Sequence, residues 1–241
     1  MRSVLEVGRG PSERDTKAQL VETAERLFAC YGLEGVSLRQ IATAAGSSNP
    51  GVVQYHFGDK QGLLRSIFAY RLSALEARRG ALLAEAQRAK ALNDARVLLQ
   101  VLLGPVGEVR DQEGRRSYAA FLLRLHNANL PSARAKQDLV FSLAPLAEHI
   151  TNLIRAAVPP MPEALFDFRQ QAASALYWQA LVDLDTERRR EGGVRVAEEA
   201  VLAEALDLGA GLLTAPVSAR AAAAFEAGSA SRAGSTDAGR R

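Results

Sequence analysis

A short stretch in the first quarter of the chain carries side chains suited to contact with a nucleic acid. Gln54 can pair through both amide atoms with an adenine edge, and Val52 can meet a thymine methyl group. Lys60 can supply a point charge for the phosphate backbone. Residues of these types, placed this close together, predict a surface that reads DNA.

Polar neighbours extend this predicted surface. Ser48, Tyr55 and His56 can donate hydrogen bonds to phosphate oxygens, and Asn49 and Gly51 lie on or beside the same outer face. For Tyr55 and His56, partial burial against the following helix is the alternative.

Two short helices must position these side chains. The first is capped by Ser37, with Gln40 completing a capping box, and ends at Gly46. The second has Pro50 in its first turn and covers 51–57. The inward positions expected to fix the angle between them are Leu38, Ile41, Ala42, Ala45, Val53 and Phe57. The pair is a helix-turn-helix signature, in which the second helix enters a major groove; the alternative is simple packing within an all-α protein.

Longer helices are expected on both sides of this pair. The one before it is predicted to start near Thr16, with Gln19 as a capping-box partner, and to end at Gly32. Its apolar face is Leu20, Val21, Ala24, Leu27, Phe28 and Tyr31. Asp59 is expected to cap the one after it. The apolar stripe of that helix is Leu63, Leu64, Ile67, Phe68, Leu72 and Leu75.

A set of spaced residues runs through all four helices. It reads Tyr31-Gly32-x-x-Gly35-Val36-Ser37-x-x-x-Ile41-Ala42-x-x-Ala45-Gly46, and then Tyr55-His56-Phe57-x-x-Lys60-x-x-Leu63-Leu64. This pattern covers about 14–64 and resembles the DNA-binding domain of the TetR (tetracycline repressor) family of bacterial transcriptional regulators.

The resemblance implies roles for individual residues. Groove and phosphate contacts are implied for Gln54, Tyr55, His56 and Lys60. Backbone contacts from the preceding helix are implied for Ser37 and Arg39. The chain departs from the family by one extra residue within 47–50. Phe57 fixes the alignment with the family from Gln54 onward, so the roles implied there are firmer than those in the turn at 47–50.

The chain as a whole is predicted to be all-α. A three-helix helix-turn-helix domain (15–62) is expected to join a helical-bundle domain for ligand binding and dimerisation (63–216). A flexible arm (1–14) and a disordered tail rich in Ala, Gly, Ser and Arg (217–241) are expected at the ends. The further predicted helices cover about 94–103, 114–129, 132–157, 163–190 and 196–214. Breaks are expected at Gly104-Pro105, Pro131, 159–162 and Gly192-Gly193, with a kink at Pro145.

The last two helices predict a homodimer. Small residues alternate with leucines in 163–190 and 196–214, which permits close packing, and four such helices from two chains would form a bundle. Packing within one subunit is the alternative. Arg188-Arg189-Arg190 is interpreted as a charged helix end.

Family resemblance also implies a small-molecule effector. The candidate ligand-binding residues are Tyr118, Phe121, Arg124, His126 and Trp178. A pocket of aromatic side chains with a few polar groups is typical of such sites. The alternatives are that the aromatic residues are plain core and that the polar ones are solvated.

Composition excludes several other classes. The net charge of +3 and the pI near 9.2 favour an anionic partner only weakly, because acids match the basic residues within 1–60. A membrane-spanning helix needs about twenty consecutive apolar residues, and the sequence contains no such run. With one cysteine, Cys30, and no third partner for His126 and His149, neither a metal site nor a cofactor is expected. A cytoplasmic location fits best.

The predicted function is therefore a DNA-binding repressor that a small molecule releases from double-stranded operator DNA. An activator or a ligand-independent regulator is the alternative. A helical-bundle enzyme would need a nucleophile–base pair or paired carboxylates in a pocket, and the sequence shows neither.

Overall fold

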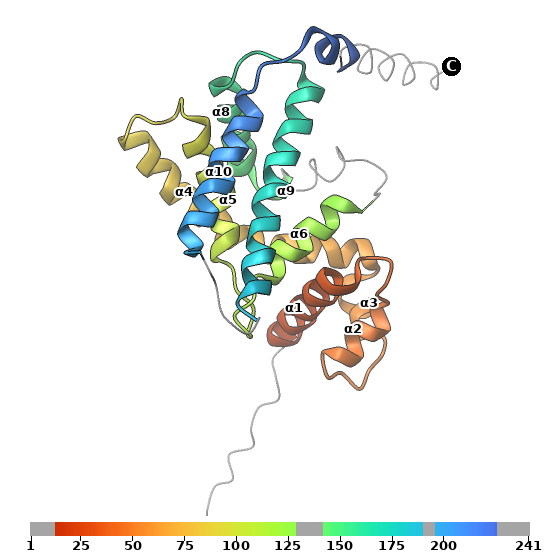
Figure 1. The fold of residues 1–241 in the computed structure, drawn as a ribbon. Helices are drawn as coiled ribbons and strands as arrows, with labels where there is room; N and C mark the ends of the chain where they lie inside the picture. Colours follow the sequence, from red (N-terminus) through yellow and green to blue (C-terminus); the bar gives the residue numbers. More distant parts are fainter. Residues whose placement is uncertain (1–12, 129–141, 190–195, 226–241) are drawn as a thin grey trace, which may run out of the picture.

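The computed structural model describes residues 13–128, 142–189 and 196–225. All regular structure within these ranges is helical, which confirms the all-α prediction. The helices are α1 (Glu13–Tyr31), α2 (Leu38–Ala44), α3 (Val52–Phe57), α4 (Lys60–Arg88), α5 (Ala95–Glu108), α6 (Ser117–Asn127), α8 (Pro145–Ala157), α9 (Glu163–Glu187) and α10 (Glu198–Thr214). Helices α1 to α3 gather at one end of the molecule. Helices α9 and α10 run side by side through the rest of it, and the C-terminal end of α9 reaches α1 (Figure 1).

Side-chain caps fix where α2 and α4 begin. The Gln40 N–H donates to Ser37 Oγ at 3.2 Å, and the Ser37 N–H donates to Gln40 Oε1 at 2.8 Å, so both bonds of the predicted capping box form. Asp59 Oδ1 accepts from the Gly62 N–H at 2.7 Å at the start of α4. These two predictions are confirmed.

The capping box predicted at Thr16 is wrong. Helix α1 already begins at Glu13, so Thr16 lies inside it. The Gln19 amide instead donates to the Ala45 carbonyl oxygen at 3.1 Å. This contact links α1 to the end of α2. The Gln19 side chain therefore makes a tertiary hydrogen bond instead of the helix cap that the local pattern predicted.

Two proline predictions also need correction. Helix α5 continues through Gly104 and Pro105 to Glu108, because the proline lies in its last turns and is buried among apolar neighbours that stabilise the helix. Pro145 does not kink a long helix; it is the first residue of α8, where its missing N–H has no helical partner to lose. The break predicted at Pro131 lies outside the described residues.

The chain ends differ in part from prediction. Residues 219–225, expected to be disordered, form a short helix, and the Phe225 ring lies 6.0 Å from the Phe168 ring, so this large apolar side chain has a partner. The rest of the tail and the arm before Glu13 lie outside the described residues. Within the described ranges no single helix is long and apolar enough to cross a membrane. Helix α10 and the 219–225 helix, which are bent by 81° relative to each other, have the length and apolar composition of a membrane span only when they are taken together.

A single connected cluster of buried apolar side chains extends from α1 to α10. All six predicted stripe residues of α4 are buried, whereas Tyr31, at the last residue of α1, is 68% exposed because the apolar face of α1 leaves the core there. At the junction of α1, α4 and α6, the ring of Phe121 lies 6.5 Å from Phe28 and 5.8 Å from Phe68. The helices on both sides of the predicted boundary near residue 62 therefore share one core.

Gly62 is required by close packing of the first turn of α4 against the end of α3. A Cβ atom added there would lie 2.0 Å from the Phe57 carbonyl oxygen. We expect Gly62→Ala to destabilise the protein by about 1–3 kcal/mol, since backbone must shift to make room. Gly104→Ala is the matched control, because its Cβ would meet nothing closer than Gln100 Cγ at 3.8 Å. Urea unfolding measures both, and equal midpoints would contradict the packing explanation.

Candidate nucleic-acid interface

The outer face of α3 is held by a buried inner face. Val53 on α3 and Ile41 and Ala42 on α2 are completely buried, which fixes the angle between the two short helices as predicted. Gln54 and Tyr55 point the opposite way; both are exposed, and Tyr55 is 81% exposed. The helix-turn-helix therefore presents these two side chains to solvent on a rigid support.

The turn before α3 accommodates the extra residue by bonding to itself. The Asn49 N–H donates to Ser47 Oγ at 3.2 Å, and the Gly51 N–H donates to Asn49 Oδ1 at 2.9 Å. Asn49 thus shapes the turn. Ser48 and Gly51 are exposed beside it.

Three of the predicted contact residues lie partly inward. Val52 is half-buried against the core. The His56 side chain is only 8% exposed, with Nδ1 3.9 Å from Glu13 Oε1 on α1. Lys60 Nζ donates to the Leu33 carbonyl oxygen at 2.9 Å, which fastens the loop between α1 and α2. These residues have structural roles that their spacing in the sequence does not reveal.

The two residues predicted on α2 differ in their freedom. The hydroxyl group of Ser37 is used in the capping box. Arg39 is exposed, and its side chain makes no hydrogen bond or ion pair with the described residues. Arg39 therefore adds an available positive charge beside the outer face of α3.

A buried carboxylate connects this interface to the remaining helices. Glu25 on α1 has no solvent exposure, and both its oxygens accept from Arg71 on α4, at 2.7 and 3.1 Å. The Ser117 hydroxyl at the start of α6 donates to Glu25 Oε1 at 2.5 Å. Burial alone would lower the pKa of Arg71, but its hydrogen bonds to Glu25 outweigh that effect and raise it. Helices α1, α4 and α6 are thereby joined at one point.

The neighbouring residue, Arg116, makes a second buried cluster. Its side chain is fully buried; Nη1 lies 2.7 Å from Asp185 Oδ1 on α9, and Nη2 contacts Glu198 on α10. Its backbone N–H donates to Asp185 Oδ2 at 2.6 Å. The start of α6 is therefore bonded to α1 and α4 on one side and to α9 and α10 on the other.

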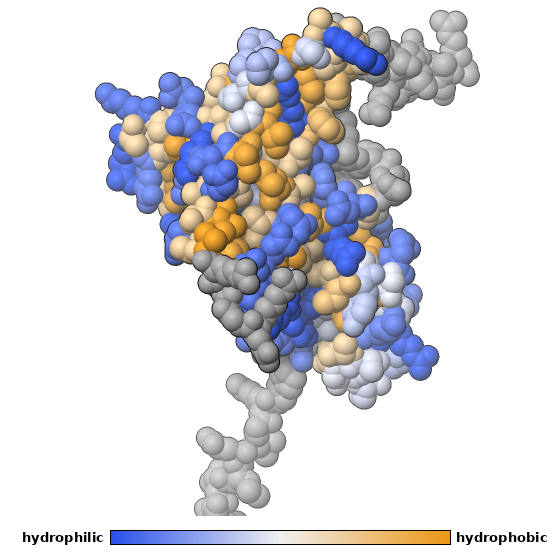
Figure 2. Space-filling model, viewed as in Figure 1, coloured by the Kyte–Doolittle hydropathy of each residue, from blue (hydrophilic) through white to orange (hydrophobic). Residues whose placement is uncertain are grey.

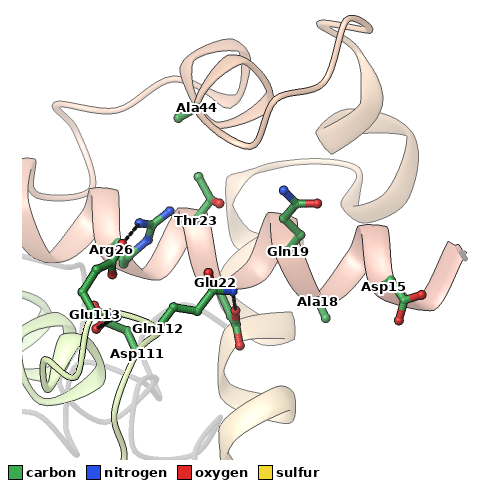
Figure 3. Close-up of a pocket in the computed structure, with 10 residues that line it drawn as sticks. All are labelled: Asp15, Ala18, Gln19, Glu22, Thr23, Arg26, Ala44, Asp111, Gln112 and Glu113. Carbon is green, nitrogen blue, oxygen red and sulfur yellow. Dashed lines mark hydrogen bonds and ion pairs between the residues drawn. The ribbon is translucent and has the colours of Figure 1, made fainter. Parts of the chain in front are cut away.

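A cavity of about 320 Å³ opens between α1, the end of α2 and the loop from α5 to α6 (Figure 3). Its wall is polar, and its charged groups are largely paired. Arg26 lies 3.2 Å from Glu113, and Glu22 accepts from Gln112 at 3.4 Å and from the Tyr70 hydroxyl at 2.8 Å. Desolvation and the hydrogen bond to Glu22 raise the pKa of Tyr70. These pairs link α1, which supports the helix-turn-helix, to α4 and to the loop between α5 and α6.

The five predicted ligand-binding residues do not line this cavity. Tyr118 and Phe121 are buried in the aromatic junction, where burial raises the pKa of Tyr118. Arg124 is exposed and donates to the Ala29 carbonyl oxygen at 3.2 Å, a favourable place for a cation at the end of α1.

His126 and Trp178 pack edge to face, with ring centroids 6.3 Å apart. Trp178 Nε1 is buried and has no acceptor among the described residues. No group of three or more His, Cys, Asp or Glu side chains is placed to hold a metal ion in the part of the chain that the structure describes.

Comparison with known proteins places residues 20–67 in a family described as bacterial regulatory proteins, tetR family. The HTH-type transcriptional repressor AcnR of Corynebacterium glutamicum is 33% identical over 63 residues, and AcnR of Corynebacterium efficiens matches to the same extent. Those residues are 26% of this chain, and they span a third of the length of each relative. The crystal structure of the TetR family transcriptional regulator PfmR from Thermus thermophilus aligns over 82% of this chain and 99% of its own, with 21% identity and a TM-score of 0.43.

Removal of the buried carboxylate should be costly. We expect Glu25→Ala to lower the free energy of unfolding by about 3–5 kcal/mol, because it leaves the Arg71 guanidinium without its partner inside the protein. Glu108→Ala removes an exposed pair with Arg78 and should cost less than about 1 kcal/mol. Urea denaturation measures both variants; similar losses would show that Glu25 does not hold the three helices together.

Proposed function

We propose that the chain is a member of the TetR family of bacterial regulatory proteins, whose model matches residues 20–67. On this proposal it represses transcription by binding operator DNA through α3 and is released by a small molecule. The observation that carries the proposal is the outward face of α3. Gln54 and Tyr55 are fully available there, while Val53 holds the helix from behind. The relatives named as repressors match this chain over 63 residues.

Contacts to DNA follow from the chemistry of each exposed group. Gln54 reads a base edge in the major groove, where its amide can pair with adenine. Tyr55, Ser48 and Arg39 contact phosphates around it and fix the register of the helix. Lys60 adds charge with the two ammonium protons that the Leu33 carbonyl leaves unused.

An apolar face on α9 and α10 supports a homodimer. Phe168 on α9 is 60% exposed, and Leu208 and Leu212 on α10 are 51% and 40% exposed. Figure 2 shows apolar side chains gathered over these two helices. Since exposed apolar patches of this kind mark interaction surfaces, a second copy of the chain would bury this face. Two α3 helices would then meet successive major grooves, spaced by about one turn of DNA, roughly 34 Å, or somewhat more.

Release by an effector requires two conformers with different affinities for the ligand. Helix α4 belongs to both functional regions, and its Arg71 holds Glu25 of α1. The unsatisfied indole N–H of Trp178, next to His126, supports a polar ligand group in this part of the helical domain. Activation, or repression without a ligand, uses the same DNA contacts. Reporter expression with and without the gene distinguishes repression from activation. Addition of a ligand distinguishes ligand-dependent repression from repression without a ligand.

Gln54→Ala should relax base preference at one position of each half-site. We expect a loss of about 1–3 kcal/mol in discrimination at that base pair, because the paired amide contacts disappear while the fold is unchanged. The measurement is fluorescence anisotropy on operator variants selected from random DNA by the wild-type protein.

Gln87→Ala is the matched control, since Gln87 is an exposed glutamine near the far end of α4. Unchanged discrimination in Gln54→Ala, or equal losses in the two variants, would remove Gln54 from base recognition.

Leu212→Glu should separate the dimer. A charged side chain at the centre of the apolar face should weaken association by at least about 2 kcal/mol. Sedimentation velocity across a concentration series measures this. Leu143→Glu is the control, because Leu143 is exposed to a similar degree, 37%, and lies outside α9 and α10. A wild-type protein that stays monomeric, or a Leu212→Glu protein that stays dimeric, would contradict the proposed interface.

A further inference from the structure

We propose that a small organic anion, with a carboxylate or phosphate head on a short apolar body, binds in a second cavity between α1, α6 and α9. This cavity has a volume of about 200 Å³. At roughly 30 Å³ per water molecule, it has room for about seven waters, which is the size of a small organic anion. None of the five residues predicted to bind a ligand contributes to its lining.

The wall carries more positive than negative charge. Four arginines line it, Arg26, Arg115, Arg116 and Arg189, against two carboxylates, Asp111 and Asp185. The buried Arg116 is fully used by its own partners, and Arg115 pairs with Asp111 at 2.9 Å. Arg26 pairs with a carboxylate outside the cavity wall.

Arg189 is different from the other three. Its guanidinium makes no ion pair or side-chain hydrogen bond with the described residues, although it lies in the wall of the cavity. A free guanidinium presents parallel N–H donors that match a carboxylate or a phosphate in a two-bond arrangement. Arg189 is therefore the anchor for the anionic head.

The remaining wall suits an apolar body. Ala29 of α1, Ala120 of α6 and Val182 of α9 line the cavity with the thiol-bearing Cys30. The cavity therefore has an apolar part beside its charged residues, and small-molecule sites combine these two kinds of surface. The polar cavity shown in Figure 3 is a weaker candidate, because its carboxylates already accept from Arg26, Gln112 and Tyr70.

Positive charge is also crowded next to this site. Burial and then the charge of Arg116 lower the pKa of Arg110, which lies in the loop between α5 and α6. An incoming anion relieves this repulsion. The electrostatic environment thus agrees with the geometry of the wall.

The position of the site gives it a regulatory consequence, which rests on the proposed function. The wall includes Ser117, which holds Glu25 of α1, and Arg116, which holds Asp185 of α9. A bound anion contacts the DNA-reading end and the α9 helix at the same time. It therefore biases their relative orientation in proportion to its preference for one conformer.

Cys30 makes the site measurable without DNA. It is the only cysteine in the chain, it is exposed, and it lines the cavity. We would measure its alkylation by iodoacetamide on the full-length protein by mass spectrometry, with butyrate, phenyl phosphate or neutral butyramide added. At about 10 mM a probe with a Kd near 1 mM fills most sites.

Saturable protection by butyrate or phenyl phosphate, with none by butyramide, is the expected result. The more potent anion identifies the head group that the site prefers. Arg189→Gln should weaken protection at least tenfold, whereas Arg189→Lys should retain part of it. Arg220→Gln, an exposed arginine outside the cavity, should leave it unchanged.

Three results would overturn the site: no saturable protection by either anion, equal protection by butyramide, or wild-type protection in Arg189→Gln. Because the assay contains no DNA, its failure would leave operator binding untouched. Conversely, failure of operator binding would leave the alkylation result intact.

Discussion

The carboxylate of Glu25 has no contact with solvent, although it belongs to α1, the helix that supports the helix-turn-helix. An unpaired charge in that position would oppose folding by several kcal/mol. Arg71 from α4 and Ser117 from α6 must both be present to satisfy it. This one group therefore joins α1 to α4 and α6, and the aromatic junction of Phe28, Phe68 and Phe121 joins the same three helices by apolar packing.

Local patterns were sufficient to predict most of the helices. Apolar spacing located α4, and the caps at Ser37 and Asp59 set the starts of α2 and α4, because each of these signals operates within a few residues. The failures had partners distant in the sequence. The Gln19 amide found the Ala45 carbonyl, and the interruption expected at Pro105 did not occur because a buried environment outweighed a local preference.

The same distinction applies to the candidate sites. The exposed face with Gln54 could be predicted, since the period of a short helix determines it. The inward contact of Lys60 could not, because a long side chain can reach the Leu33 carbonyl only in the folded chain. The second cavity could not be predicted either, because its wall combines residues of α1, α6 and α9 that are distant in the sequence. From the sequence, the arginines at 188–190 are interpreted only as a charged helix end. In the structure Arg188 pairs with Glu198, and Arg189 lines the cavity.

The recognition helix separates two tasks among adjacent residues. Val53 supports the fold, while Gln54 and Tyr55 contribute almost nothing to internal packing. Replacement of these two side chains would therefore leave stability nearly unchanged. If α3 reads DNA as we propose, selection can alter the preferred operator in small steps without first restoring a damaged core. A duplicated gene of this kind then acquires a new set of targets while the rest of the fold stays as it was.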